Sequence, residues 1–323
     1  MYERFPYPSP RAEGQKLKGL ANLLKIFGTE TGYRFSGKSV LDVGTGTGHR
    51  LIEAAATFPD AKFTAVDLSE AALRIARQVA AQQAVQNVQF HLANMMESEK
   101  TLGSFDMVLG MGVIHHLSDP ALGLRNLAHC LADDGLIFLY VYGKHGCRER
   151  IRRKRIVSIL QGGEAQNFEA GISLVEDHGF DSFEYGWNVS PEDEESRNAL
   201  IVDAYLNVNE TQFEIDGIVD LMRSSGLHGS MVYGVTLDKI GRLFDTRLTK
   251  KAGMLPTTQP AAHLRTLAAK EKYERLSLID KYRLLDLFYQ PNGYTLLAYN
   301  LEANRYFSSC SRILSNLLMV KTG

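Results

Sequence analysis

The sequence predicts an α/β protein with a mostly parallel sheet that helices cover on both faces. Short apolar segments alternate with helical segments from residue 38 to about residue 142. These apolar segments are hydrophobic almost throughout, as is usual for parallel strands buried on both faces. Three glycines at every second position, Gly44, Gly46 and Gly48, follow the first apolar segment, where ligands bind in open α/β sheets.

Local signals support each predicted element. Ser69 is suited to cap a helix, and Asp119 followed by Pro120 is suited to open another. Asp134 and Gly135 predict a turn before the fifth strand. The predicted strands are 39–43, 63–66, 88–92, 107–109, 136–143, 231–235 and 294–300, and helices are predicted at about 14–27, 48–57 and 213–225.

The bulk composition excludes several classes of protein. The 323 residues are 45% hydrophobic and 23% charged, as in ordinary globular proteins, and the net charge of −1 favours neither nucleic acid nor an anionic membrane. Cys130, Cys147 and Cys310 show no metal-ligand spacing, so no metal site is expected. We predict a cytoplasmic protein, because the sequence shows neither a signal peptide nor a membrane span.

The glycine turn indicates which nucleotide is bound. A dinucleotide fingerprint needs a third glycine where this chain has His49, and no GK[ST] motif is present for a P-loop. Asp42 would repel a pyrophosphate and favour a ligand that carries positive charge. S-adenosylmethionine carries both an ammonium and a sulfonium group.

Asp67 is the second predicted anchor, at the end of the second strand. It lies 23 residues beyond Gly44, close to the offset of about 20 residues that is usual for a ribose-binding acid. An acid at this position suits NAD and S-adenosylmethionine equally and excludes NADP. The choice between the two ligands therefore rests on Asp42.

The segments VLDVGTGTG, AVDLS, LANMM, FDMVLGMGVIHHL and DDGLIFLYVYG resemble, in order and spacing, those of class I S-adenosylmethionine-dependent methyltransferases. The resemblance covers about residues 38–145. It implies a Rossmann-like, doubly wound, seven-stranded and mostly parallel sheet whose last strand is antiparallel, here with helical insertions. It also implies that S-adenosylmethionine is the cofactor.

The same resemblance assigns the cofactor contacts. The methionine end of the cofactor would lie at the glycine turn, the ribose at Asp67 and the adenine beside Leu68. Asn94 stands where the family usually has an aspartate, but its amide oxygen can accept the same hydrogen bond. The implied cofactor-binding residues are Asp42, Gly44, Thr45, Gly46, Asp67, Leu68, Asn94, Met95, Gly110 and Met111.

His115 and His116 are the candidate catalytic residues. They follow the fourth strand in VIHHLSDP, which resembles a segment of small-molecule O-methyltransferases whose histidine is the catalytic base. In that alignment His115 takes the base position, and His116 replaces an aspartate. Histidine titrates in the range that suits a base, but His115 could also line the cofactor pocket or be structural.

The predicted acceptor side lies outside the motifs. In this superfamily, insertions after the fifth strand commonly cap the acceptor pocket, so Asp203 and Tyr205 are candidate substrate contacts, together with Tyr7 of the Pro-rich arm. The basic segment 144–155 could dock nucleic acid or simply be a solvated helix face. The predicted segments are an arm and helix at 1–37, a cofactor-binding core at 38–145, a cap at 146–212, and the remaining domain at 213–323 with a helical insertion at about 236–290.

These observations predict a methyltransferase that acts on a small-molecule acceptor, at oxygen or nitrogen, by direct displacement. One alternative is a protein or RNA methyltransferase that docks through residues 144–155. Another is a regulator that binds S-adenosylmethionine without catalysis. The sequence does not predict the oligomeric state.

Overall fold

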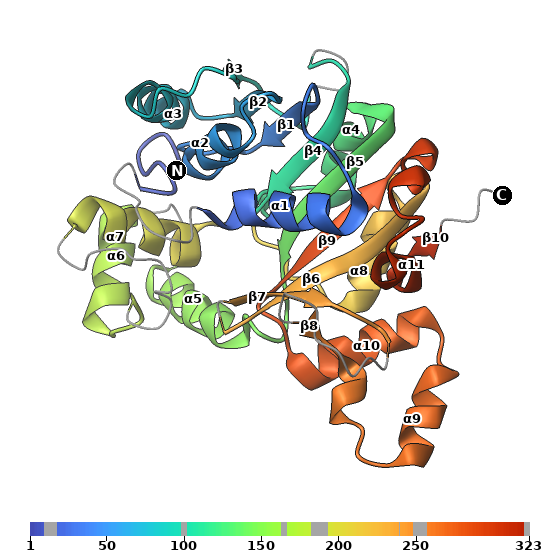
Figure 1. Ribbon diagram of the computed structural model, residues 1–323. Helices are drawn as coiled ribbons and strands as arrows, with labels where there is room; N and C mark the ends of the chain where they lie inside the picture. The colour runs from blue at the N-terminus through green and yellow to red at the C-terminus, as the bar shows by residue number, and fades with distance from the viewer. Residues whose placement is uncertain are drawn as a thin grey trace. The chain divides into compact units, whose positions relative to one another are not determined.

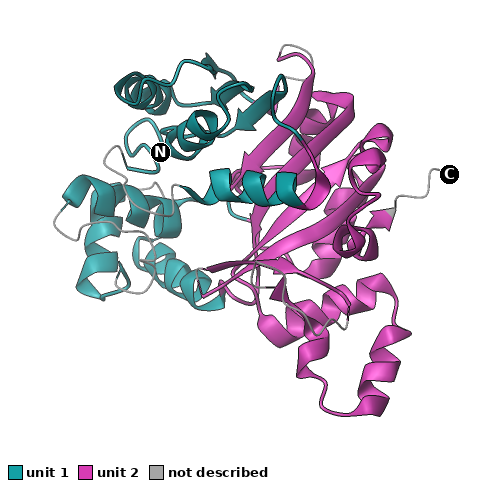
Figure 2. Cartoon of the chain, in the orientation of Figure 1, with its two compact units in different colours: residues 1–29, 34–94, 148–210 teal, residues 30–33, 95–147, 211–323 magenta. Residues whose placement is uncertain are grey.

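A computed structural model describes residues 1–9, 18–97, 102–162, 167–181, 193–238, 240–247 and 257–319. The chain divides into two compact units, each assembled from separate stretches of sequence (Figure 2). Unit 1 comprises residues 1–29, 34–94 and 148–210, and unit 2 comprises residues 30–33, 95–147 and 211–323.

Unit 1 contains three parallel strands in the order β3-β2-β1 (Figure 1). Val43 at the end of β1 lies opposite Val66, and Asp67 at the end of β2 lies opposite Leu92. The carboxyl ends of these strands therefore meet at one edge, as predicted. The strands are β1 (Ser39–Val43), β2 (Lys62–Asp67) and β3 (Val88–Leu92), and the helices in the same part of the sequence are α1 (Gly19–Thr31), α2 (His49–Thr57) and α3 (Glu70–Gln82).

The local signals for these elements are confirmed. The Ser69 side chain caps α3 by accepting a hydrogen bond from the backbone N–H of Ala72. Gly48 allows α2 and α3 to approach closely, because a Cβ atom there would lie 2.7 Å from the Cβ of Ala76. The predicted helix at 14–27 corresponds to α1, which begins at Gly19, and its residues 14–17 lie outside the described residues.

Unit 1 also contains a group of helices contributed by the insertion after the fifth strand, which we call the cap (Figure 1). Its buried apolar side chains form a hydrophobic cluster that includes Val157, Val175 and Ile201. Met1 and Phe5 of the N-terminal arm pack against the same cluster. The cap consists of α5 (Arg148–Leu160), α6 (Phe168–Asp177), α7 (Glu194–Ile201) and a π-helix at Val202–Leu206.

Unit 2 contains the remaining strands in the order β4-β5-β9-β6-β7-β8, and β10 pairs with β6. β4 and β5 are parallel, whereas β9 is antiparallel to both β5 and β6, which confirms the predicted antiparallel last strand. The bounds are β4 (Phe105–Met111), β5 (Leu131–Tyr142), β6 (Gly229–Leu237), β7 (Ile240–Phe244), β8 (Thr257–Thr258), β9 (Gly293–Tyr299) and β10 (Leu318–Met319).

The helices of unit 2 follow the predicted order as far as α8. Asp119 caps α4 by accepting a hydrogen bond from the N–H of Leu122, and Pro120 occupies the first turn. The helices are the 3-10 helix Ile114–His116, α4 (Pro120–His129), α8 (Ile215–Arg223), the 3-10 helix Pro260–His263, α9 (Leu267–Glu274), α10 (Leu278–Tyr289), the 3-10 helix Leu301–Tyr306 and α11 (Ser311–Asn316).

Three details differ from the prediction. The turn expected at Asp134 and Gly135 falls inside β5, where the pairing with β4 shifts register between Phe105 and Met107. The insertion at 236–290 is helical only in its second part, because β7 and β8 precede α9 and α10. β7, β8 and β10 also extend the sheet beyond the strands that the sequence predicts.

The predicted fold class is confirmed as an α/β protein with a mixed, mostly parallel sheet of the Rossmann-like methyltransferase type. Among the described residues, no helix combines the length and the apolar character needed to cross a membrane.

Candidate functional site

The glycine turn joins β1 to α2 and has the backbone conformation that its glycines predict. Gly44, Gly46 and Gly48 have φ angles of 68°, 58° and 74°, in the left-handed region that glycine adopts at least cost. The N–H groups of Gly44 and Thr45 donate hydrogen bonds to the carbonyl of Val66 in β2. The turn is thereby held against the end of the neighbouring strand.

Asp67 lies where the turn meets β2, and its carboxylate organises the local backbone. One oxygen accepts a hydrogen bond from the N–H of Gly46 at 2.7 Å, and the other accepts one from the N–H of Ser69 at 2.9 Å. Burial raises the pKa of this carboxyl, while the backbone N–H groups of Ser69, Gly46 and Leu68 oppose the rise. Each oxygen can accept a further hydrogen bond, which fits a ligand with two neighbouring hydroxyl groups.

The predicted adenine side continues from Asp67. Leu68 is 69% exposed, so an apolar side chain directly after the acid is open to a flat ring. The N–H of Ala93 donates to the Asp67 carbonyl at 3.1 Å, which fixes the end of β3 beside the end of β2. Asn94 follows Ala93 and is half-buried.

Asp42 is the buried acid of the turn, and its side chain is 5% exposed. Burial raises its pKa to about 7, and Arg50 partly opposes this rise. A buried carboxyl of this kind is stabilised in its ionised form by a positively charged ligand. The residues present therefore fit the sulfonium and ammonium groups of S-adenosylmethionine better than a pyrophosphate.

The N-terminal arm, residues 1–9, lies directly against the glycine turn. The carbonyl of Tyr7 accepts a hydrogen bond from the N–H of Thr47, and the carbonyl of Pro8 accepts one from the Thr47 hydroxyl at 2.8 Å. A Cβ atom on Gly46 would lie 2.1 Å from the Tyr7 carbonyl oxygen. Glycine at position 46 is thus required by the arm as well as by the φ angle. The first residues form a turn, closed by a hydrogen bond from the N–H of Arg4 to the carbonyl of Met1.

The arm also contacts the cap. The Tyr2 hydroxyl donates to the carboxylate of Asp203 at 2.9 Å and accepts from the amide of Asn207 at 3.0 Å. The rings of Phe5 and Phe168 meet edge to face at 5.4 Å. Further contacts join Arg4 to Glu169 and Ser9 to Ser196.

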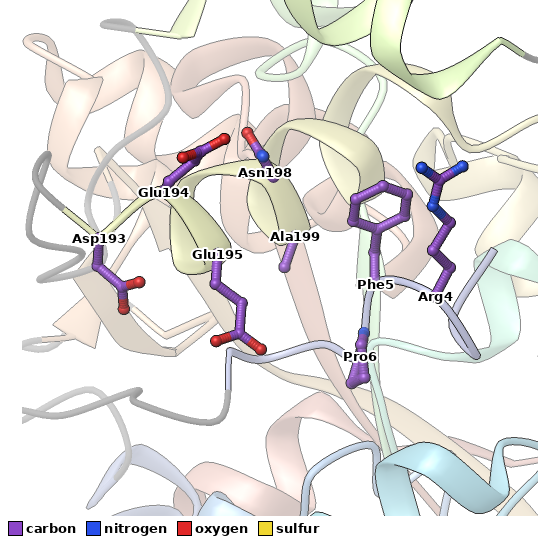
Figure 3. A pocket seen from close by; sticks show the side chains of 8 residues that line it. All are labelled: Arg4, Phe5, Pro6, Asp193, Glu194, Glu195, Asn198 and Ala199. Atoms are coloured by element: carbon purple, nitrogen blue, oxygen red, sulfur yellow. The ribbon is translucent and has the colours of Figure 1, made fainter.

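A cavity of about 530 Å³ lies between the arm and α7 (Figure 3). Three carboxylates at the start of α7 line it on one side, and the ring of Phe5 lines it on the other. Its lining residues are Arg4, Phe5, Pro6, Asp193, Glu194, Glu195, Asn198 and Ala199.

The structure places the predicted acceptor residues as follows. Asp203 is 6% exposed and accepts the hydrogen bond from Tyr2. Tyr205 is 2% exposed, and its hydroxyl donates to the carbonyl of Phe180 inside the cap. Tyr7 is half-buried and contacts the turn through its backbone carbonyl. Their roles toward a substrate remain predictions.

Most cations of the basic segment 144–155 are paired with carboxylates. Arg150 and Lys154 both bind Glu210, whose side chain is 2% exposed. Arg152 and Arg153 both bind Glu149. In unit 2, Lys144 binds Glu214 at 2.8 Å. Three carboxylates thus pair with five of the seven Lys and Arg side chains of this segment, which favours a structural role over docking.

In unit 2, the predicted cofactor residues Gly110 and Met111 form the end of β4, and Met95 precedes this strand in the sequence. Gly110 packs closely against β5, because a Cβ atom there would lie 2.8 Å from Cδ2 of Leu139. Met111 is half-buried and ends the strand. Met95 is 7% exposed, and its carbonyl accepts a hydrogen bond from the amide of Asn126 at 3.0 Å.

His115 and His116 form a short 3-10 helix with Ile114, after β4. The His115 side chain is fully buried, and its ring centroid lies 3.9 Å from that of Tyr142 and 4.2 Å from that of His116. Its backbone carbonyl accepts a hydrogen bond from the N–H of Thr211 at 2.8 Å. His116 is half-buried. His115 thus contributes to packing in this unit, and its role as a catalytic base stays a prediction.

Sequence reasoning missed two features of the site. The buried pairing of Arg150 and Lys154 with Glu210 spans 60 and 56 residues, and no local pattern marks it. Thr47 was also missed as the anchor of the arm, although it stands within the glycine motif. In the described ranges, no group of three or more His, Cys, Asp or Glu side chains is arranged as metal ligands.

Comparison with known proteins agrees with this geometry. Residues 34–151 match a protein-family model described as a methyltransferase domain. The chain therefore contains an S-adenosylmethionine-dependent methyltransferase domain, and the matched residues include Asp42, Asp67 and the glycine turn.

Two curated relatives extend the comparison. An uncharacterised protein, syc1184_c of Synechococcus sp., is 27% identical over 195 residues, which are 58% of this chain and 46% of that protein. A ubiquinone biosynthesis O-methyltransferase of Neisseria meningitidis serogroup C is 34% identical over 110 residues, which are 34% of this chain and 46% of that protein. The matched parts span less than half of these relatives.

Among solved structures, PKMT2 from Rickettsia typhi in complex with AdoHcy is similar in fold. It is 17% identical with a TM-score of 0.58, and the match covers 86% of this chain and 52% of that chain. The match therefore reaches well beyond residues 34–151.

Proposed function

We propose that this chain transfers the methyl group of S-adenosylmethionine to a small-molecule acceptor by direct displacement. The observation that carries the proposal is the pair of acids at the glycine turn. Asp42 is a buried carboxyl with a raised pKa, and Asp67 is a carboxylate that retains acceptor capacity beside the exposed Leu68. Together they suit a cationic nucleoside.

S-adenosylmethionine would supply a methyl group on a positively charged sulfur, which is open to attack by an acceptor lone pair. The residues would then have separate tasks. Asp67 would hold the ribose hydroxyls, and Asp42 in its ionised form would stabilise the positive charge of the donor. An acceptor that carries a proton needs a base, and His115 or His116 is the candidate for that task.

Two observations favour a small acceptor. A helical cap stands in unit 1 beside the arm that contacts the glycine turn, as expected of a site that encloses its substrate. The relative from Neisseria meningitidis is named for an O-methylation in ubiquinone biosynthesis. Docking of a protein or RNA through residues 144–155 has less support, because Glu210, Glu149 and Glu214 pair with most cations of that segment.

The test uses S-adenosylmethionine with an isotope-labelled methyl group. The purified protein is incubated with the donor and a cell extract, and the label is sorted into small-molecule, protein and RNA fractions. We expect label in the small-molecule fraction that disappears with the Asp67→Ala variant. Label confined to the protein or RNA fraction would contradict the proposal of a small-molecule acceptor. The absence of any transfer despite cofactor binding would favour a regulator.

A further inference from the structure

Tyr2 connects the arm to the interior of the cap through its side chain. Its hydroxyl donates to Asp203 and accepts from Asn207, at 2.9 Å and 3.0 Å. Asp203 is 6% exposed and Asn207 is 5% exposed. A residue at the start of the chain is therefore bonded by two buried polar groups, one in the π-helix and one directly after it.

The backbone of Tyr2 connects the arm to the cofactor side. Its carbonyl accepts a hydrogen bond from the Ser69 hydroxyl at 3.3 Å. The N–H of Ser69 in turn donates to the Asp67 carboxylate at 2.9 Å. A continuous chain of hydrogen bonds thus runs from the predicted ribose-binding acid, through Ser69 and Tyr2, to Asp203.

The rest of the arm repeats this two-sided attachment. Tyr7 and Pro8 bind Thr47 of the glycine turn through their carbonyls. Phe5 packs against Phe168 of α6, and Ser9 contacts Ser196 of α7. The contacts of the arm with the glycine turn therefore help to hold it against the cap, and its contacts with the cap help to hold it against the glycine turn.

We propose that Tyr2 is a positioning residue that couples occupancy of the cofactor site to the order of the cap. A ligand on Asp67 and the glycine turn would restrain the backbone that holds the arm. The arm would then hold the π-helix and α7 in one arrangement before an acceptor enters. Because such coupling is reciprocal, a bound acceptor would tighten cofactor binding as well. This proposal rests on the proposed function, since it assumes that the cofactor binds at Asp67.

The test measures amide hydrogen exchange in the full chain, with and without saturating S-adenosylhomocysteine. The readout is exchange in residues 194–207, which include α7 and the π-helix. In the wild-type protein we expect the ligand to slow this exchange by about tenfold, within the usual range of coupling between sites. In Tyr2→Phe, which removes one hydroxyl, we expect the ligand to bind but to slow the same exchange by less than about twofold.

Tyr205→Phe is the matched control. Like Tyr2→Phe, it removes one tyrosine hydroxyl. Tyr205 lies in the π-helix that carries Asp203, and its hydroxyl bonds to the carbonyl of Phe180 within the cap and not to the arm. It should speed exchange of the cap with and without ligand and should retain the ligand-dependent difference. Asp203→Leu, which removes the other end of the Tyr2 bond, should behave as Tyr2→Phe does.

Calorimetry on the same samples separates the two proposals. If S-adenosylhomocysteine does not bind the wild-type protein, the proposed function fails. If the ligand binds but leaves residues 194–207 unprotected, or if Tyr2→Phe and Asp203→Leu keep the full protection, the coupling is overturned. Loss of the ligand-dependent difference in Tyr205→Phe would also contradict it, because the effect would then reflect general weakening of the cap.

Discussion

The backbone N–H of Gly46 donates a hydrogen bond to the carboxylate of Asp67, and the two atoms lie 2.7 Å apart. This bond joins the glycine turn after β1 to the acid at the end of β2. Removal of the carboxylate would therefore disturb both the predicted ribose contact and the turn itself. The arm is attached to the same turn through Thr47.

We expect Asp67→Ala to weaken S-adenosylmethionine binding about 100-fold or more, because it removes two hydrogen bonds to a charged acceptor, each worth about 1.5–3 kcal/mol. Isothermal titration calorimetry measures the change. Asp60→Ala, which removes an exposed acid from the same unit, is the control and should leave the affinity unchanged. If both variants bound S-adenosylmethionine with equal affinity, Asp67 would not be part of the cofactor site.

Asp42 makes cofactor binding depend on pH. Its pKa is raised to about 7 by burial, so the carboxyl is largely protonated at pH 6 in the free protein. A cationic ligand favours the ionised form, so binding near pH 6 should release a proton, and the affinity should rise between pH 6 and pH 8. Calorimetry in two buffers of different ionisation enthalpy measures the released proton. The Asp42→Asn variant should release none from this site.

The same shift affects the stability of the free protein. Because the folded-state pKa of Asp42 lies above its ordinary value of 3.8, the folded state binds the proton more tightly than the unfolded chain does. This contribution to stability is complete below about pH 4 and is lost as the pH rises toward 7. Urea unfolding at pH 5 and pH 8 should show a larger loss of stability in the wild-type protein than in Asp42→Asn.

Gly46→Ala should displace the arm. The new Cβ atom would lie 2.1 Å from the backbone oxygen of Tyr7, and the φ angle of 58° adds strain. Gly37→Ala is the matched control, because Gly37 also has a positive φ angle, of 75°, but nothing within 4 Å of its Cβ position. The control should lose only about 1–2 kcal/mol of stability. Hydrogen exchange in residues 1–9 should rise in Gly46→Ala alone, and a similar rise in Gly37→Ala would contradict the contact.

Glu210→Gln should destabilise the cap by about 3–5 kcal/mol, because it leaves the buried Arg150 and the half-buried Lys154 without their carboxylate. Burial alone would raise the pKa of Glu210, but the hydrogen bonds and charges of Arg150 and Lys154 outweigh it and lower the pKa to about 2. Its contribution is therefore present above about pH 4.5 and is lost as the pH falls toward 2.

Urea unfolding at pH 7 and pH 3 measures this contribution of Glu210. Glu149→Gln is the control, since Glu149 binds Arg152 and Arg153 at the more exposed surface of α5. The control should cost much less stability. If both variants lost the same stability, Glu210 would not be the buried centre of the basic segment.

Much of the fold around the glycine turn could be predicted because it is encoded in short, contiguous patterns. The alternation of apolar strands and helices predicts the sheet, and the caps Ser69 and Asp119 were confirmed at their positions. The positive φ angles of Gly44, Gly46 and Gly48 are a local requirement that glycine meets at least cost, so the motif alone predicts them. The regular part of the fold therefore follows from local periodicity and turn chemistry.

The features that the sequence did not predict are those that depend on neighbours in space. The turn predicted at Asp134 and Gly135 lies inside β5, because the strand pairs with β4 from Leu131 onward. In the basic segment, Arg150 and Lys154 pair with Glu210, which lies 60 and 56 residues away in the sequence. Charge patterns alone do not reveal such partners.

The sequence by itself determined the α/β fold class and the chemistry expected at Asp42, Asp67 and the glycine turn, because each depends on residues close together in the chain. Only the tertiary structure decided that Tyr2 bonds to Asp203, 201 residues away, and that the arm makes glycine necessary at position 46. The physical reason is that a hydrogen bond or a close contact depends on distance in space, which packing of the whole unit establishes.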